Sequence, residues 1–184
     1  MKEYSSATQL LNNLASKGFD LQIPINVEHI ASMLDVLVID DPHLEEIDSI
    51  GEISFCEEKA VIRINPFQNS YKPRRRFTLA HEIAHYCLHS HSSRKEFKDS
   101  RKTMSRSESY WDIYESEANG FAAQLLMPRE LIVKEGNELI LSYTKLHSVS
   151  DGMSKSEFIE QMASLFEVSN SAMVYRLKSL KIIS

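Results

Sequence analysis

Residues His81-Glu82-Ile83-Ala84-His85 combine the residue types and the spacing that a zinc-dependent hydrolase needs. In a helix with about 3.6 residues per turn, His81 and His85 lie one above the other, so both imidazoles can reach one metal ion. Glu82 is next to His81, where its carboxylate can accept a proton from a water whose pKa a bound metal lowers from about 15.7 to about 7. The motif therefore predicts His81 and His85 as metal ligands and Glu82 as a catalytic base.

The residues around this motif favour a metal site over a chance match. Apolar side chains cover nearly every side of the stretch Arg76–His89, which predicts a helix buried near the centre of the fold. Two histidines and a glutamate are costly to bury unless something pairs them, and a metal ion would do so. The alternative, a surface helix that carries two histidines, fits this apolar context poorly.

A catalytic zinc takes three protein ligands, so a third ligand must come from elsewhere. His91 would complete the pattern H-E-x-x-H-x-x-L-x-x-H, but Leu88 stands where such a site needs a glycine to end the helix. With Leu88 the helix continues, and His91 points away from the metal. His89 lies one helical turn further from the metal, so it is expected either to pack in the core or to hydrogen-bond to a ligand. Both histidines are poor third ligands.

A better source is a helix predicted over residues 112–127, which Pro128 ends. At about 100° per residue, Glu115 shares a face with the apolar residues, whereas Glu117 falls on the opposite, polar face. A glutamate on a buried face needs a cation, so Glu115 is the predicted third ligand and a substitution of Glu117 is expected to be nearly silent. Asn119, one turn after Glu115, is a candidate to hold a histidine by its other ring nitrogen.

The segments before the motif predict an α+β fold in which helices and a small sheet position the metal helix. Amphipathic helices are expected over residues 5–17 and after the cap Asn26, and strands at Val36–Ile39, Ile50–Phe55 and Ala60–Asn65. The last of these strands leads into the metal helix. Its free edge either pairs with an extended peptide or is an ordinary sheet edge without a binding role.

Two segments lack periodicity and are predicted to be loops. Residues 43–49 are acidic, and residues 92–109 are rich in Ser, Lys and Arg. The second segment lies between the two helices of the site, as a solvated surface loop or a lid. Pro73 fits the first turn of the metal helix, and the cluster Arg74-Arg75-Arg76 that follows it is either solvated or meets acidic partners.

The C-terminal residues predict two helices. Ser154 and Glu157 form a capping box, and Ser169 can cap the second helix. The residues expected to face inward are Phe158, Met162, Leu165, Phe166, Ala172, Met173, Leu177 and Leu180. Helix, short turn, helix is also the outline of a DNA-reading unit. Its contacts would come from Tyr175, Arg176, Lys178 and Lys181. Three basic residues on an acidic protein favour packing on the core or docking of a partner over direct DNA binding.

Length and composition exclude several classes of protein. The 184 residues suit one compact domain, and the net charge of −5 gives no general attraction to nucleic acid. No apolar run approaches the length of a membrane span, and the polar N-terminus does not have the pattern of a signal peptide. Cys56 and Cys87 are isolated thiols, as in a reducing compartment. Together these features predict a cytoplasmic protein.

The stretches R-F-T-L-A-H-E-I-A-H-Y-C-L-H and E-S-E-A-N-G-F-A-A-Q-L-L-M-P closely resemble the ImmA/IrrE family of zinc metallopeptidases. The similarity extends to I-P-I-N-V-E-H-I-A-S-M-L-D-V and F-E-V-S-N-S-A-M-V-Y-R-L. The resemblance implies a minimal gluzincin-like fold with a small sheet beside the zinc helix. It also implies His81, His85 and Glu115 as Zn²⁺ ligands, with Glu82 catalytic.

The same resemblance suggests a partner and a domain organisation. Members of the family often cleave or inactivate a helix-turn-helix repressor encoded nearby, in phage-like, mobile-element or stress-response circuits. With the two C-terminal helices predicted above, residues 1–150 are expected to form the metallopeptidase core, and residues 151–184 a helix-turn-helix-like segment packed on it.

Three functions are compatible with these patterns. The leading one is a cytoplasmic zinc endopeptidase that acts on one or a few regulatory proteins. The second is a zinc-stabilised protein that controls its partner without cutting it, and the third is a DNA-binding regulator that uses the C-terminal helices. The group that would stabilise an oxyanion stays open among His89, His91, Tyr143 and His147.

Overall fold

The computed structural model of the chain describes residues 4–56, 59–90, 96–100, 113–146 and 152–184. The strands are β1 (Val36–Asp40), β2 (Ser49–Cys56), β3 (Lys59–Ile64) and β4 (Glu96–Ser100). The helices are α1 (Ala7–Ala15), α2 (Val27–Met33), η1 (Pro42–Ile47, a 3₁₀ helix), α3 (Lys72–His89), α5 (Ile113–Leu126), α6 (Arg129–Leu146), α7 (Lys155–Phe166) and α8 (Asn170–Ser179).

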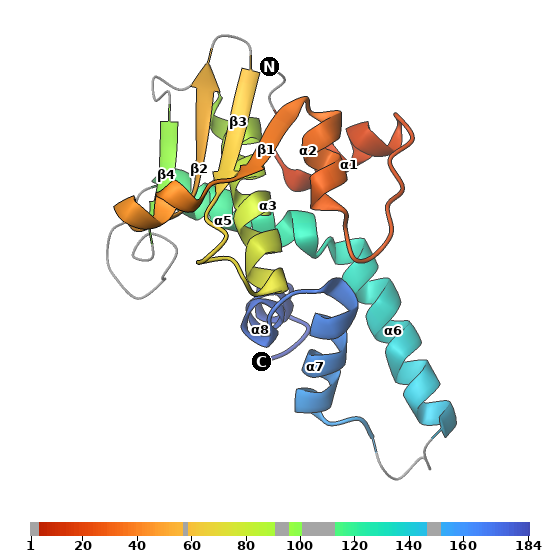
Figure 1. The fold of residues 1–184 in the computed structure, drawn as a ribbon. Helices are drawn as coiled ribbons and strands as arrows, with labels where there is room; N and C mark the ends of the chain where they lie inside the picture. Colours follow the sequence, from red (N-terminus) through yellow and green to blue (C-terminus); the bar gives the residue numbers. More distant parts are fainter. Residues whose placement is uncertain (1–3, 57–58, 91–95, 101–112, 147–151) are drawn as a thin grey trace.

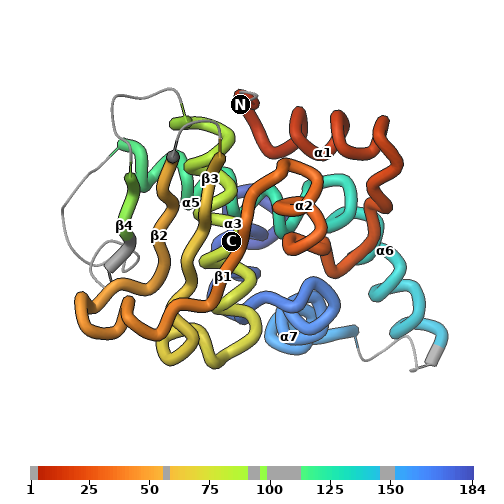
Figure 2. Tube along the Cα trace, turned by 45° about the horizontal axis from the view of Figure 1, so that its top comes forward, coloured from red at the N-terminus to blue at the C-terminus, as the bar shows by residue number. Residues whose placement is uncertain are grey.

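The sheet lies on one side of the molecule, with α3 and α5 behind it (Figure 1). Helices α1 and α2 lie beside the β1 edge, while α7 and α8 lie near the N-terminal end of α3 (Figures 1 and 2). Helix α6 runs away from the sheet. The predicted α+β class with a small sheet is confirmed, and α3 occupies the centre of the fold.

The strand order is β1-β3-β2-β4, with β1 parallel to β3 and the other pairs antiparallel. The register places Ile62 of β3 opposite Ile53 of β2, and Ile53 opposite Phe97 of β4. All three side chains are buried, so they form one apolar row across the sheet. Strand β3 is internal, and the prediction that its edge is free for a peptide is wrong. Among the strands that the structure describes, β1 and β4 are the outer ones.

The helix starts follow from the capping residues in the sequence. The side chains of Ser6, Asn26, Ser154 and Ser169 each accept a hydrogen bond from a backbone N–H in the first turn of the helix that follows. At the end of α1, Gly18 adopts a φ of +91°, a left-handed conformation that glycine adopts without steric cost. These boundaries agree with the predicted ones to within a few residues.

Three segments differ from their predictions. Residues 43–49, predicted as loop, form most of η1 and the start of β2. Within residues 92–109, Glu96–Ser100 form strand β4, and the rest lie outside the described residues. The sequence patterns above predict no element over residues 129–146, which form α6. None of the described helices is long and apolar enough to cross a membrane.

The C-terminal helices pack on the core through both apolar and polar contacts. Met162, Phe166, Met173 and Leu177 are buried in the same apolar cluster as α3 and α5. Arg76 of α3 donates hydrogen bonds to the backbone oxygens of Ile25, at 2.9 Å, and of Glu167, at 3.2 Å. The predicted inward face is partly wrong, because the face is rotated toward Ile159. Leu165 is 41% exposed, and Phe158 is only partly buried.

Candidate metal centre

The centre of α3 supplies three ionisable side chains that water does not reach. His81, Glu82 and His85 each have 0% of their surface exposed. The four-residue spacing brings Nε2 of His81 to 3.0 Å from Nε2 of His85. Two ring nitrogens this close, inside an apolar helix, form one half of a candidate metal site.

Helix α5 crosses α3 and completes the group with a carboxylate. One oxygen of Glu115, Oε2, lies 3.1 Å from Nε2 of His81, and the other, Oε1, lies 3.4 Å from Nε2 of His85. The ligand atoms of His81, His85 and Glu115 lie within 4.8 Å of one another, and these three residues are called the metal group below. The structure thus brings together the three residues that the sequence predicted as ligands.

The separations within this group suit a tetrahedral zinc ion. Zinc binds imidazole nitrogen and carboxylate oxygen at about 2.0–2.2 Å, so two ligand atoms at tetrahedral positions are about 3.3–3.6 Å apart. The observed separations are 3.0 to 3.4 Å. Two nitrogens and one oxygen also match the His₂Glu ligand set of catalytic zinc sites. Both the spacing and the donor types therefore fit zinc.

The protonation state of Glu115 also suits a ligand. Burial of the carboxyl group raises its pKa, but hydrogen bonds from protonated His81 and His85, and the charges of those rings, lower it by more. The net effect holds the pKa of Glu115 below its ordinary value. The side chain is a carboxylate at neutral pH, the form that binds a metal cation.

Glu82 is held against the sheet by a close approach of the backbone at Gly51 in β2. A Cβ atom at Gly51 would lie 2.8 Å from Oε1 of Glu82 and 2.7 Å from Cγ2 of Thr78. Both distances are shorter than van der Waals contact, so only glycine leaves Glu82 in this position. The hydroxyl of Thr78 donates a 2.7 Å hydrogen bond to Asn69, which fixes the helix on this side.

A chain of hydrogen bonds runs outward from His85. Its Nδ1 lies 3.0 Å from Nδ1 of His89, and Nε2 of His89 lies 3.1 Å from Oε2 of Glu117. One set of tautomers satisfies both contacts: His85 donates Nδ1–H to His89, and His89 donates Nε2–H to Glu117. Once Nε2 of His85 has lost its proton, as metal binding requires, this set directs the Nε2 lone pair toward His81 and Glu115. His89 is therefore placed to orient His85, a candidate ligand.

The ring of Phe97 in β4 forms a wall of the site. It stacks on the imidazole of His85, with ring centroids 4.4 Å apart and planes 20° apart. It also contacts His89 and Tyr114 at centroid distances of 5.5 and 5.9 Å. Because β4 is an outer strand, this contact brings a sheet edge beside the metal group.

None of the other candidates from the sequence is placed at the metal group by the part of the chain that the structure describes. Asn119, predicted to hold a histidine, makes no side-chain hydrogen bond within the described part of the chain, and His89 takes that place for His85. Tyr143 lies near the end of α6, which runs away from α3 (Figure 1). His91 and His147 lie outside the described residues.

Three contributors were missed from the sequence: Gly51, Phe97 and the link between His89 and Glu117. Gly51 lies in a predicted strand, where an isolated glycine is a known sign of a close backbone approach. Phe97 is the one apolar residue of E-F-K-D-S, which is too little for a strand pattern. The contact between His89 and Glu117 depends on how α3 and α5 cross, which the spacing of residues in the sequence does not predict.

Comparison with known families agrees with the resemblance noted from the motifs. Residues 33–178 match the family described as Peptidase_M78, IrrE N-terminal-like domain. The matched stretch contains α3 and α5, and with them every residue of the metal group. No curated protein matches the chain.

Proposed function

Because this chain belongs to the IrrE N-terminal-like family, Peptidase_M78, we propose that it is a zinc-dependent endopeptidase that cleaves a helix-turn-helix transcriptional repressor. The observation that carries the proposal is the convergence of His81, His85 and Glu115 beside the buried Glu82. The repressor, as part of a phage-like, mobile-element or stress-response circuit in the cytoplasm, is suggested by the family resemblance of the two main motifs.

In the proposed reaction, His81, His85 and Glu115 hold the metal, and Glu82 moves the proton. Bound zinc would polarise the scissile carbonyl and lower the pKa of water from about 15.7 to about 7. Glu82 accepts one proton as the water oxygen bonds to the carbonyl carbon. It then gives that proton to the amine nitrogen as the peptide bond breaks. The apolar walls of α3 and the ring of Phe97 limit the access of bulk water.

The outer edge of β4 is the proposed track for the substrate backbone. An extended peptide can add to a free strand edge through main-chain hydrogen bonds. Strand β4 pairs with β2 on one side, and its Phe97 touches His85. A peptide on the other side of β4 would therefore pass next to the metal group. Selectivity for one protein follows if the substrate must present an extended segment to this edge.

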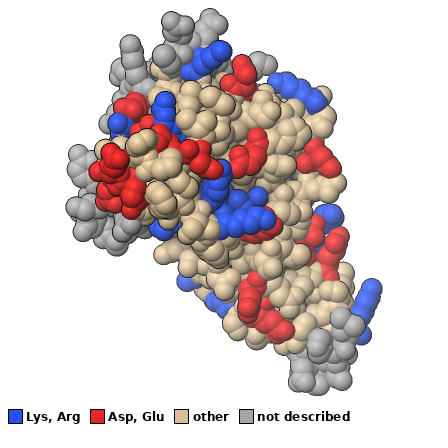
Figure 3. All heavy atoms as spheres, in the orientation of Figure 1, with Lys and Arg blue, Asp and Glu red and all other residues tan. Residues whose placement is uncertain are grey.

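Direct DNA reading receives little support from the C-terminal helices. Arg176, one of its predicted contacts, donates a 2.8 Å hydrogen bond to the backbone oxygen of Met127 and is partly buried. On the face shown in Figure 3, the Lys and Arg side chains of the described residues are interspersed with Asp and Glu and form no extended basic patch there. Phosphate contacts need such a patch.

The test is a comparison of the wild-type chain with Glu82→Gln during co-expression with a repressor encoded in a neighbouring reading frame. Gln keeps the size of Glu but cannot accept the proton. The variant should keep its zinc and its affinity for the repressor, while cleavage falls by about 10²–10⁴ from the loss of general-base catalysis. A defined repressor fragment, measured by mass spectrometry, reports cleavage. Equal relief of repression by both proteins, with no fragment, would show that the chain is a zinc-stabilised binding protein and not a protease.

A further inference from the structure

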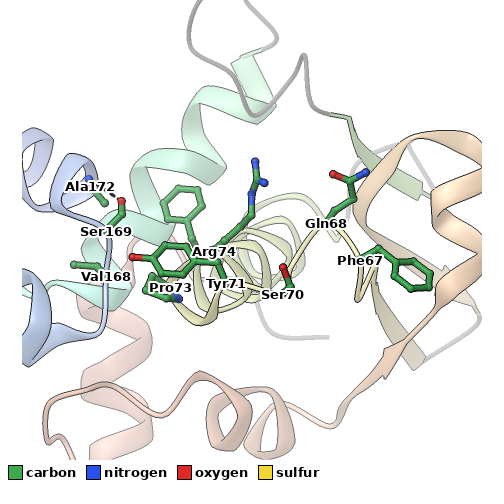
Figure 4. Close-up of a pocket in the computed structure, with 10 residues that line it drawn as sticks. Phe67, Gln68, Ser70, Tyr71, Pro73, Arg74, Val168, Ser169 and Ala172 are labelled. Atoms are coloured by element: carbon green, nitrogen blue, oxygen red, sulfur yellow. Dashed lines mark hydrogen bonds between the residues drawn. The ribbon is translucent and has the colours of Figure 1, made fainter.

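A pocket of about 420 Å³ lies at the N-terminal end of α3, between the loop that precedes this helix and the turn between α7 and α8. One side is lined by Phe67, Tyr71 and Phe77 together with Gln68, Ser70, Pro73 and Arg74, and the other side by Val168, Ser169 and Ala172. Figure 4 shows Tyr71 and Pro73 facing Val168 and Ser169. This volume, with apolar side chains and a few polar groups in the lining, is typical of a pocket that receives a side chain of a ligand.

The pocket and the metal group share one face of α3. Arg74, Phe77 and His81 are spaced three and four residues apart, so their side chains project from the same side of the helix. The rings of Phe77 and His81 are 6.5 Å apart, with Phe77 in the pocket wall. At 1.5 Å per residue, Phe77 and Arg74 lie about 6 Å and about 10 Å from His81 along the axis. A substrate over the metal group can therefore reach the pocket.

The loop that carries the aromatic rim is held in place by buried amides. Asn65 accepts a 3.0 Å hydrogen bond from the backbone of Phe67 and donates one of 2.8 Å to the oxygen of Ser49. Asn69 donates 2.8–2.9 Å hydrogen bonds to the oxygens of Ile50 and Asn65. Despite this rigid support, Phe67 is 66% exposed and Tyr71 is 60% exposed. Exposed aromatic rings on a fixed loop mark a surface for binding.

The charge beside the pocket identifies the kind of partner. Lys72 and Arg76 pair with Glu167, and Arg75 pairs with Glu28 and Asp40. Arg74 is exposed, lines the pocket and makes no ion pair within the described ranges. It is the cation of this helix turn that remains available to a carboxylate. The pocket thus pairs an apolar floor with one positive charge.

We propose that this pocket selects the substrate of the protease by binding a large apolar or aromatic residue that has Asp or Glu beside it. The inference rests on the proposed function, because it places the cleaved bond at the metal group. An extended peptide rises about 3.3 Å per residue. The apolar residue therefore lies about two residues, and the acidic residue about three residues, from the cleaved bond. The substrate class is an acidic segment with an apolar anchor.

The test measures binding apart from cleavage. A random heptapeptide library displayed on phage is selected on immobilised Glu82→Gln protein. We expect enriched sequences that combine an aromatic or large aliphatic residue with Asp or Glu within two residues. A synthetic peptide of the enriched sequence should bind Arg74→Glu on the order of 10-fold more weakly, because a weak ion pair becomes a repulsion. Selection on Arg74→Glu should exchange the acidic residue for Lys or Arg.

Two further variants separate the pocket from general effects. Lys178→Glu makes the same charge change on an exposed residue of α8 outside the pocket lining, and it should change the affinity less than about 2-fold. Ala172→Phe fills the pocket and should remove the apolar preference while the circular dichroism spectrum stays unchanged. Selection without a consensus, or with the same consensus on Arg74→Glu, would overturn the inference. Peptides that bind as expected but are never cut by the wild-type chain would support the binding preference of the pocket and count against the protease function.

Discussion

The carboxylate of Glu117 lies 3.1 Å from Nε2 of His89, although more than half of the Glu117 side chain is exposed. His89 in turn contacts the buried His85 at 3.0 Å. A carboxylate behind a histidine fixes the tautomer of that histidine and raises its basicity, and here the effect passes through a second ring. Glu117 is thus linked to the metal group through His89 and His85, although it lies on the polar side of α5.

The first prediction is that Glu117→Ala weakens zinc binding by about 10- to 100-fold, the usual cost of removing a group that supports a metal ligand. The sequence pattern alone predicts that this variant is silent, so the two expectations can be separated. Competition with a chelator of known affinity measures the dissociation constant. Glu117→Gln, which keeps a hydrogen-bond acceptor, should recover part of the loss.

The control for this series is Glu138→Ala, which removes an exposed glutamate of α6 that makes no ion pair with the described residues. Its zinc affinity should equal that of the wild type. If Glu117→Ala also binds zinc as the wild type does, His89 orients His85 without help from Glu117. A fall in affinity for all three variants would instead indicate a general effect of surface charge.

The second prediction concerns the ligand set. His81→Ala and Glu115→Ala should each lose zinc on dialysis, because two remaining ligands hold the ion far more weakly than three. His43→Ala, which changes a histidine whose side chain is 85% exposed, should retain one zinc per chain. Metal analysis of the dialysed proteins gives the stoichiometry. Full zinc in His81→Ala would place the metal at other residues.

Local patterns in the sequence were sufficient for most of this fold because the physical causes are local. Ser6, Asn26, Ser154 and Ser169 cap helices through hydrogen bonds that span only a few residues. The grouping of His81 with His85 follows from one turn of helix. Glu115 was found because a buried carboxylate needs a cation wherever its helix packs.

The features that were missed depend on contacts between distant segments. Among the side chains of β4 that the structure describes, Phe97 is the buried one, and three described side chains are too few for a strand pattern, so the strand is recognised by its pairing with β2. The order of the strands along the chain does not reveal that β1 pairs with β3 in parallel, so the sequence pattern wrongly predicts a free edge on β3. Residues 129–146 follow Pro128 directly, and a proline that ends one helix can equally precede the next one.

The third prediction is that Gly51→Ala lowers both activity and stability. The added Cβ must displace Thr78 or the carboxylate of Glu82, which it would approach to 2.7 and 2.8 Å. Overpacking of this kind costs about 1–3 kcal/mol of unfolding free energy. Displacement of Glu82 should lower the rate of cleavage while zinc stays bound. Urea unfolding, zinc content and the cleavage rate together measure these effects.

Gly120→Ala is the matched control for that variant. Gly120 lies in α5, the other helix of the site, and a Cβ there has no neighbour within 4 Å among the described residues. Alanine in a helix is favoured over glycine by about 0.5–1 kcal/mol, so this variant should be as stable as the wild type or slightly more stable. A Gly51→Ala protein with the wild-type cleavage rate would show that Glu82 tolerates a shift.

The fourth prediction decides whether the C-terminal helices belong to the same cooperative unit as the metal helix. Phe166 is fully buried in the common apolar cluster, whereas its neighbour Leu165 is 41% exposed. Phe166→Ala should therefore lower the free energy of unfolding by about 3–5 kcal/mol, and Leu165→Ala by less than about 1 kcal/mol. In Phe166→Ala, the loss of helix seen by circular dichroism should coincide with release of zinc, because Arg76 of α3 is bonded to Glu167. A chain truncated after about residue 150 should be unstable for the same reason. If Phe166→Ala instead melts α7 and α8 at low urea while zinc is retained to the wild-type midpoint, the segment is a separate unit, as a DNA reader would require.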